Sequence, residues 1–256
     1  MPSFTLLNTR PAHQATELNN LIVGLGGKVI SCPTIDIEWL EPTGSDIQHI
    51  SRFDKVIFTS PNAIEGWVKC LNEPMSQSDL LALSCYAIGK GTKLKGQTVG
   101  LNIATLSDKQ FDSEHFLAHP NMQKVEGLKI ALIKGRGGLD LIKNTLTQRG
   151  ASVTQLEVYQ RKPVAFCNQA WTNFLASLKP ILLITSMASW QALLTGLNQM
   201  LNDAESVTDF LNQVCGLVVM SQRIADEIAS SGCTVPIKVV TTQSNEGIVL
   251  AIQQCV

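Results

Sequence analysis

Short apolar segments alternate with amphipathic segments along the whole chain, and this alternation limits the folds that are open to it. The apolar segments have the length of buried β-strands, and the segments between them carry apolar residues at helical spacing. One amphipathic segment repeats Ala15, Leu18, Leu21, Ile22 and Leu25 at that spacing and is closed by Gly26-Gly27. Two further helices are predicted in the same way, one from Leu139, Ile142 and Leu146 before Arg149-Gly150, the other from Ile224, Ala225, Ile228 and Ala229 before Gly232. Apolar strands that alternate with helices indicate an α/β protein with parallel sheets.

Nine segments have the length and the apolar character of buried strands. They are Phe4–Leu7, Lys28–Ser31, Val56–Thr59, Tyr86–Ile88, Ile130–Ile133, Val153–Leu156, Ile181–Thr185, Leu217–Met220 and Ile237–Val240. Two five-stranded sheets fit this number better than one ten-stranded sheet does. The length of 256 residues, which suits one large or two ordinary domains, agrees with two sheets.

The strand–helix pattern occurs twice in the same order. Residues 6–37 resemble residues 131–161, and in both a strand is followed by a turn that carries an arginine, Arg10 or Arg136. FDKVIFTSPNAIEGW (53–67) resembles KPILLITSMASWQAL (179–193), and CYAIGKGTKLKG (85–96) resembles LVVMSQRIADEIASSG (217–232) more weakly. Chance similarity between ordinary βαβ units is the alternative, but the shared order favours one tandem duplication.

Both members of the first repeat pair end in an extended tail that a proline stops, at Pro42 and at Pro163. Tails at equivalent points of a repeat predict two connectors between two domains. An ordinary edge strand followed by a loop is the alternative.

Charge and cysteine usage exclude several classes of protein. A net charge of −1 argues against nucleic-acid binding through a broad basic surface, and 45% hydrophobic residues argue against disorder. The seven cysteines form no CxxC pair, no signal peptide is recognisable, and the apolar runs are too short to span a bilayer. We therefore expect a cytoplasmic protein with free thiols and no membrane segment.

The common cofactor and metal motifs are absent from the sequence. It has no P-loop, no complete G-x-G-x-x-G and no G-x-S-x-G nucleophile elbow. His115 and His119 could share a helix face, but no third ligand is evident, and a solvated surface is the simpler interpretation. We expect no metal and no cofactor.

The turns that follow the predicted strands are small, hydroxyl-bearing or cationic. They are Thr9-Arg-Pro, Ser60-Pro-Asn-Ala, Gly89-Lys-Gly-Thr, Gly135-Arg-Gly-Gly, Ser186-Met-Ala-Ser and Ser221-Gln-Arg. Such turns gather at the carboxyl ends of parallel strands, where the following helix starts offer N–H groups to anions. Ordinary caps and turns would explain any one of them, whereas the whole set with its cations favours a polyanionic ligand.

The chain resembles the uroporphyrinogen-III synthase family along essentially its whole length. The segments that carry the resemblance are TRP at 9–11, LGGKVISCPTIDI at 25–37, FTSPNA at 58–63, AIGKGT at 87–92, IKGRGG at 133–138, LTQRGASVTQLEVYQR at 146–161 and VMSQRIADEIASSGC at 219–233. Each segment is weak alone, and their order and spacing together are specific.

The resemblance implies two similar parallel-sheet, flavodoxin-like domains joined by a two-stranded connector, with the active site in the cleft between them. We expect domain 1 to comprise residues 1–33 and 167–256, domain 2 residues 43–156, and the connectors residues 34–42 and 157–166. Two domains on such a connector could close over a substrate.

The resemblance also implies a reaction. Members cyclise the linear tetrapyrrole hydroxymethylbilane to uroporphyrinogen III, with inversion of the last pyrrole ring, loss of water and no cofactor. The substrate is a polycarboxylate, so N–H groups and cations suit it. The general acid in this resemblance is Tyr159, with a structural tyrosine as the alternative. The expected substrate-binding residues are Arg10, Ser60, Asn62, Gly89, Lys90, Gly135, Arg136, Gly137, Ser186 and Ser221.

The sequence departs from some members at Arg223-Ile224, where they have threonines, so no threonine role is carried over. We expect a monomer that acts on a small molecule and makes transient contact with the preceding deaminase. Two alternatives stay open. One is a non-catalytic two-domain protein that binds an anionic metabolite. The other is a cofactor-free α/β isomerase, for which Asp36, Glu38 and Glu157 are the acidic candidates.

Overall fold

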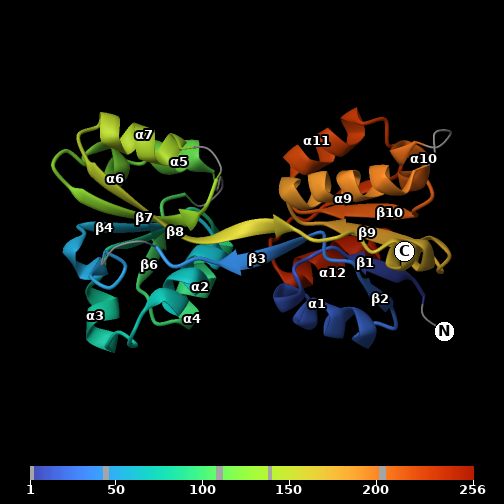
Figure 1. Ribbon diagram of the computed structural model, residues 1–256, viewed down its shortest axis with the longest axis horizontal. Coiled ribbons are helices and arrows are strands. Elements are labelled where there is room, and N and C mark those ends of the chain that lie inside the picture. Colours follow the sequence, from blue (N-terminus) through green and yellow to red (C-terminus); the bar gives the residue numbers. More distant parts are fainter. Residues whose placement is uncertain (1–2, 43–45, 108–111, 138–139, 202–205) are drawn as a thin grey trace. The chain divides into compact units, whose positions relative to one another are not determined.

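The computed structural model of the protein describes residues 3–42, 46–107, 112–137, 140–201 and 206–256. It has the α/β architecture that the alternating pattern predicts, with two mostly parallel sheets flanked by helices (Figure 1). The chain divides into two compact units, Met1–Asp36 with Lys162–Val256 (unit 1) and Ile37–Arg161 (unit 2). It therefore passes from one unit to the other twice, after Asp36 and after Arg161. Leu139, which the helical pattern includes, lies outside the described residues.

The sheet of unit 1 has the strand order β11-β10-β9-β1-β2, and neighbouring strands run parallel. The strands are β1 (Thr5–Asn8), β2 (Lys28–Ser31), β9 (Pro180–Ile184), β10 (Gly216–Val219) and β11 (Ile237–Val239). The helices are α1 (Ala12–Gly24), α8 (Asn168–Leu175), α9 (Met187–Met200), α10 (Val207–Leu211), α11 (Gln222–Ser230) and α12 (Asn245–Gln253).

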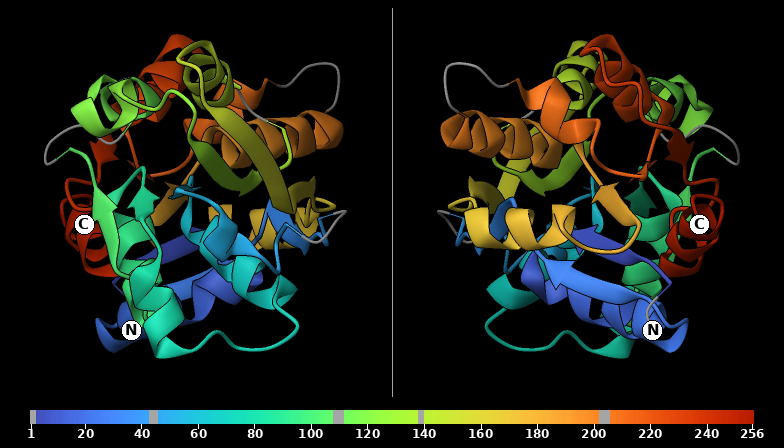
Figure 2. Two further views of the ribbon diagram at one scale, coloured as in Figure 1. Left: turned by 90° about the vertical axis from the view of Figure 1, so that its left-hand side faces the viewer. Right: turned by 90° about the vertical axis from the view of Figure 1, so that its right-hand side faces the viewer.

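Successive side chains of the unit 1 strands enter two cores on opposite faces of the sheet. Leu6 packs with Leu18 of α1 and Ile252 of α12. Leu7 packs on the other face with Trp171 of α8 and Trp190 of α9. Figure 2 shows this separation from the side, with the orange α9 and the blue α1 on opposite faces. The strands are apolar on both faces because helices cover both faces.

The sheet of unit 2 has the order β3-β8-β7-β4-β5-β6. The strands are β3 (Ile35–Trp39), β4 (Lys55–Phe58), β5 (Cys85–Ala87), β6 (Ile103–Thr105), β7 (Lys129–Gly135) and β8 (Ser152–Pro163). The helices are the 3₁₀ turn η1 (Ile50–Arg52), α2 (Pro61–Cys70), α3 (Gln77–Ala82), α4 (Lys90–Thr98), α5 (Ser113–Ala118), α6 (Pro120–Gln123) and α7 (Leu141–Gln148). One core contains Trp67 of α2, and the core on the other face contains Phe116 of α5 and Leu146 of α7.

The predicted helices form, but in α1 only some of the residues predicted to be buried are buried. Ala15, Leu18 and Ile22 of α1 are buried, whereas Leu21 and Leu25 are exposed, so the buried stripe is narrower than the pattern indicated. The helix stops because Gly26 adopts a φ of +77°, which an L side chain would resist.

Three features of the predicted sheets differ in the structure. Unit 2 has six strands rather than five, because β3 joins its edge, where the arrows of β3 and β8 run in opposite directions (Figure 1). The strand predicted at Val153–Leu156 and the tail after it are one twelve-residue strand, β8. The short strand β6 was missed because polar Asn102 and Thr105 flank Ile103-Ala104, so the segment has no continuous apolar run.

The duplication found in the sequence is present in the sheets. The order β2-β1-β9-β10-β11 of unit 1 corresponds to β8-β7-β4-β5-β6 of unit 2. The repeated segments occupy corresponding strands: residues 53–67 contain β4 and residues 179–193 contain β9.

Strand register changes one predicted equivalence. Leu6 pairs with Ile181 in unit 1, and Ile130 pairs with Lys55 in unit 2. Ser186 and Ser60 each follow those partners by five positions (181 to 186 and 55 to 60). Arg10 and Lys134 each lie four positions after Leu6 and Ile130 (6 to 10 and 130 to 134). The counterpart of Arg10 is therefore Lys134 and not Arg136, because β7 extends to Gly135, with a register shift at its end.

Candidate functional site

Most of the residues singled out in the sequence lie at or just after the carboxyl ends of strands, and Tyr159 lies within β8, opposite Gly135 at the end of β7. Unit 1 carries Arg10 after β1, Ser186 after β9 and Ser221 after β10. Unit 2 carries the others: Ser60, Asn62, Gly89, Lys90, Gly135, Arg136, Gly137 and Tyr159. Because the strands of each sheet are mostly parallel, each group lies at the end of its own sheet where the strands have their carboxyl ends.

The three serines begin helices. The side chain of Ser60 accepts a hydrogen bond from the N–H of Ala63, and Ser186 and Ser221 do the same for Ser189 and Ile224. Gly89 occupies the same position before α4 without a side-chain cap. The serine oxygens therefore complete their own helices, as the cap interpretation predicts. The first N–H groups of each helix still give its start a partial positive charge.

Tyr159 is a buried residue of unit 2. Its side chain is 2% exposed and belongs to the core between β8 and α2. Its Oη lies 3.0 Å from Oγ of the half-buried Ser60 and 3.4 Å from Nη2 of Arg161. The Arg161 guanidinium also lies 5.5 Å from the centre of the Tyr159 ring. The phenol hydroxyl is thus reached through Ser60 and Arg161 rather than by direct exposure.

Gly135 makes room for that ring. A Cβ atom at Gly135 would lie 2.5 Å from Cζ of Tyr159, far inside van der Waals contact. The expected substrate-binding Gly135 is therefore a packing partner of Tyr159. Gly137 has a different requirement, since its φ of +80° favours glycine although no atom crowds its Cα.

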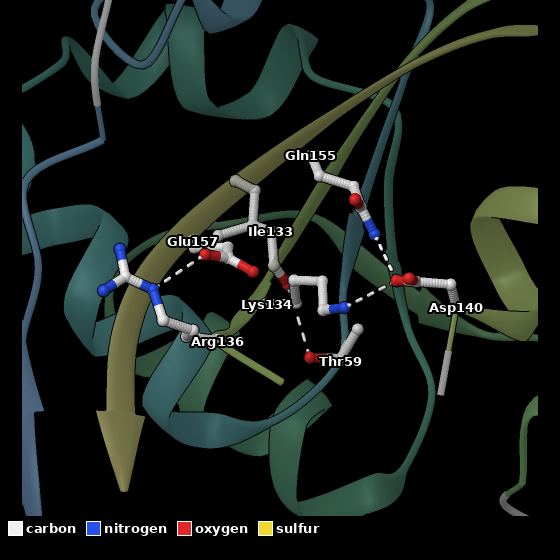
Figure 3. A network of polar contacts seen from close by, with 7 residues as sticks. All are labelled: Thr59, Ile133, Lys134, Arg136, Asp140, Gln155 and Glu157. Atoms are coloured by element: carbon white, nitrogen blue, oxygen red, sulfur yellow. Dashed lines mark hydrogen bonds and ion pairs between the residues drawn. The ribbon is translucent and has the colours of Figure 1, made fainter. Parts of the chain in front are cut away.

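Arg136 is held by polar residues of β8 (Figure 3). Its Nε donates to Oε2 of Glu157 at 3.0 Å, and its backbone N–H donates to the carbonyl of Tyr159 at 2.7 Å. Its Nη1 lies 3.5 Å from Oε1 of Gln160, whose amide in turn donates to Glu38. The charge of Arg136 is therefore balanced by a carboxylate in this structure.

Lys134 is a cation that the sequence analysis missed. It is 8% exposed, and its Nζ donates to Oδ1 of Asp140, just before α7, at 3.0 Å (Figure 3). The Gln155 amide donates to the same oxygen at 2.9 Å. Hydrogen bonds from Gln155 and from Lys134 lower the pKa of Asp140. The equivalence with Arg10 could have revealed Lys134 had the strand register been known.

Arg10 lies at the carboxyl end of the unit 1 sheet, where Lys134 lies in unit 2. It is half-buried, and its Nη1 donates to Oδ1 of Asn245, the first residue of α12, at 2.7 Å. The Asn245 amide donates to Glu17 at 2.6 Å. Burial lowers the pKa of Arg10, and the charge of Glu17 opposes that change. An arginine stays protonated even so, and Arg10 is a fixed cation at the carboxyl end of the unit 1 sheet.

A chain of buried hydroxyls lies beside Arg10. Thr9 Oγ1 donates to the carbonyl of Leu183 at 2.6 Å, and Ser189 Oγ donates to Thr9 Oγ1 at 3.1 Å. Thr34 Oγ1 lies 2.8 Å from Ser189 Oγ. These contacts tie the ends of β1 and β9 to α9, and they fix the backbone that carries Arg10.

The remaining candidates lie at helix starts or are histidines. Lys90 is exposed at the start of α4, and Asn62 is half-buried in the first turn of α2. His115 binds the carboxylate of Asp112, and His119 caps α6. Within the part of the chain that the structure describes, His, Cys, Asp and Glu side chains form no group of three or more that could hold a metal ion.

Comparison with known proteins gives one consistent family. A family model described as "Uroporphyrinogen-III synthase HemD" matches residues 16–245. A protein from Proteus mirabilis named uroporphyrinogen-III synthase is 30% identical over 178 residues, which are 66% of this chain and 88% of that protein. A protein of the same name from Escherichia coli (strain K12) is 27% identical over 254 residues, 97% of this chain and 100% of that protein.

Solved structures agree on the fold. A uroporphyrinogen III synthase variant from Thermus thermophilus superposes with a TM-score of 0.63 at 15% identity and covers 98% of both chains. The corresponding protein from Helicobacter pylori 26695 gives a TM-score of 0.60 at 15% identity, over 99% of this chain and 100% of that one. No helix among the described residues is long and apolar enough to cross a membrane.

Proposed function

Because the chain belongs to the uroporphyrinogen-III synthase family, a family of cyclising lyases in tetrapyrrole biosynthesis, we propose the specific reaction that it catalyses. It converts hydroxymethylbilane into uroporphyrinogen III, with inversion of the last pyrrole ring and loss of water. The match of the family model over residues 16–245 carries this proposal. The carboxyl ends of the two sheets, with their cations and helix starts, support it.

The carboxyl ends of both sheets offer groups that can bind the substrate's carboxylates. Arg10 in unit 1 and Lys90 in unit 2 supply positive charge, and the helices that begin after Ser60, Gly89, Ser186 and Ser221 supply N–H groups. We propose these residues, together with Asn62, Gly135, Arg136 and Gly137, as the substrate-binding set. The dipoles of several helix starts can bind a polyanion without a large net charge on the protein.

The chemical step needs an acid and a defined substrate conformation. Protonation of the leaving hydroxyl releases water and gives an azafulvenium cation, an electrophile that closes readily without help and returns a proton on ring closure. Inversion requires attack at the substituted carbon of the last ring, so the protein acts mainly by orienting the chain. Tyr159 is the proposed acid. Its buried hydroxyl lies 3.0 Å from the half-buried hydroxyl of Ser60, which offers a route for the proton to the surface.

The finer properties are proposals as well. We propose a cytoplasmic monomer that needs no cofactor, binds neither nucleic acid nor membrane, and makes transient contact with the preceding deaminase. We also propose that residues 34–42 and 157–166 connect a domain of residues 1–33 and 167–256 with a domain of residues 43–156.

The reaction is tested directly with its substrate. The protein is incubated with hydroxymethylbilane, the products are oxidised, and the uroporphyrin isomers are separated chromatographically. Type III is expected to predominate over the type I isomer that forms spontaneously. Type I alone, at the spontaneous rate, would contradict the proposal and favour a protein that only binds an anionic metabolite, or a different isomerase.

A further inference from the structure

Arg161 lies on the same side of β8 as the proposed acid, and neither the sequence patterns nor the comparisons single it out. Residues two positions apart on a strand point to the same face, which places the Arg161 side chain beside that of Tyr159. Arg161 Nη2 is 3.4 Å from Tyr159 Oη, and the guanidinium is 5.5 Å from the ring centre. One cation therefore contacts both the hydroxyl and the π-system of the same side chain.

The charge of Arg136 is paired with a carboxylate, whereas that of Arg161 has no such partner among the described residues. Arg136 forms an ion pair with Glu157 at 3.0 Å. Across residues 3–42, 46–107, 112–137, 140–201 and 206–256, no ion pair involves Arg161. The positive charge next to Tyr159 is thus not neutralised by a carboxylate of the described chain.

Tyr159 is otherwise surrounded by apolar groups. Its ring is buried in the unit 2 core, and Gly135 lies against the ring. Ser60 is a neutral partner of the hydroxyl. A phenol that gives up its proton in such a place needs a nearby cation, because the apolar core does not solvate the negative oxygen that remains.

We propose that Arg161 is a positioning residue for the acid step: it fixes the Tyr159 hydroxyl against Ser60 and stabilises the negative charge that develops on Oη as the proton leaves. This inference rests on the proposed function, in which Tyr159 is the acid. It predicts that Arg161 acts on turnover and through Tyr159, whereas a residue that binds a substrate carboxylate would act on affinity.

A double-mutant cycle tests this coupling. Steady-state kinetics of type III formation are measured for wild type, Arg161→Met, Tyr159→Phe and the double variant. Arg161→Met is expected to lower kcat about tenfold and to change KM by less than about twofold. The double variant is expected to have the kcat of Tyr159→Phe alone, because the cation has no hydroxyl left to act on.

Two further variants separate charge from packing. Arg161→Lys keeps a cation near the hydroxyl and is expected to retain a kcat within about threefold of wild type. Arg52→Met, at the 3₁₀ turn of unit 2, removes the same charge elsewhere and is expected to leave kcat and KM unchanged. If Arg161→Met does not fold, Arg161→Gln takes its place in the cycle, and thermal unfolding of each variant is recorded.

Some results would overturn the inference. A raised KM at unchanged kcat would mean that Arg161 binds a substrate carboxylate. Multiplying effects in the double variant would show that Arg161 acts independently of Tyr159. Both results leave the proposed function intact, whereas a wild-type protein that forms no type III isomer contradicts the proposed function itself.

Discussion

Gly135 and Tyr159 are in direct contact across neighbouring strands: a Cβ atom on Gly135 would stand 2.5 Å from Cζ of the tyrosine ring. The ring is buried, and its hydroxyl is held by Ser60, so it has little freedom to withdraw. The space that glycine leaves therefore fixes the position of the proposed acid.

Gly135→Ala is expected to destabilise the protein by about 1–3 kcal/mol, because the extra methyl overpacks the core. It is also expected to lower kcat, because the displaced ring carries the hydroxyl away from Ser60. Urea unfolding followed by tryptophan fluorescence measures the first effect, and type III formation measures the second. Gly91→Ala is the control, since its nearest neighbour, Pro61 Cγ, is at 3.8 Å. A stable Gly135→Ala protein with wild-type turnover would refute the packing argument.

Tyr159→Phe is expected to lower kcat by about 10²-fold or more and to change KM little, as loss of a general acid would. Tyr86→Phe makes the same chemical change in the same unit, where Lys55 and Ser84 contact the hydroxyl. It is expected to leave kcat unchanged. Equal kcat values for Tyr159→Phe and wild type would show that Tyr159 is a structural residue.

Glu157→Gln is expected to strengthen substrate binding. The carboxylate of Glu157 occupies Nε of Arg136, and the neutral amide would free that charge for a substrate carboxylate. KM is expected to fall about two- to fivefold at low ionic strength, with a smaller change at high salt because ions screen exposed charges. Stability should change by less than about 1 kcal/mol, since the pair is exposed. An unchanged KM at low salt would exclude Arg136 as a carboxylate partner.

The contacts of Asp140 predict that part of the protein's stability is lost at acidic pH. Gln155 and Lys134 lower its pKa below the ordinary value of 3.8, so the folded state binds its proton less tightly than the unfolded state does. The stability that these contacts contribute is present above pH 3.8 and is lost as the pH falls through the lowered pKa. The urea midpoints of wild type and Asp140→Asn should therefore converge as the pH is lowered. Asp226→Asn on α11 is the comparison, and a gap that persists at low pH would contradict the ionic origin of the effect.

Burial divides the cysteines into two reactivity classes. Desolvation raises the pKa of Cys32 to about 11 and that of Cys85 to about 12, whereas Cys167 and Cys215 are exposed. Because the thiolate is the reactive form, iodoacetamide near neutral pH should label Cys167 and Cys215 first. Mass spectrometry of digested, labelled protein measures the order. Early labelling of Cys85 in folded protein would mean that the β5 core opens readily.

Much of the fold could be predicted from local pattern. Helical spacing located α1, α7 and α11, and the internal repeat predicted the matching order of the two sheets. The missed strand β6 is the counterpart of β11, so the repeat held a signal for it: Ile103 follows Leu101 as Ile237 follows Val235. Local pattern failed there because Asn102 and Thr105 interrupt the apolar run around Ile103.

The candidate site was less accessible to sequence reasoning. Turn chemistry identified the serines, glycines and cations at strand ends, because caps and left-handed turns are local requirements. Lys134 was missed because its equivalence with Arg10 depends on strand register, and register is set by pairing between distant segments. Arg161 was missed because its contact with Tyr159 depends on the face to which β8 turns both side chains.

The sequence by itself determined the α/β class, the internal duplication and the segments in which chemistry-bearing residues occur, because periodicity and turn composition are written locally. Only the tertiary structure decided that Tyr159 is buried, that Gly135 makes room for it and that Glu157 already occupies Arg136. Each of these facts depends on which strands lie side by side. That choice follows from burying both faces of a sheet at once, a property of the whole unit rather than of any one segment.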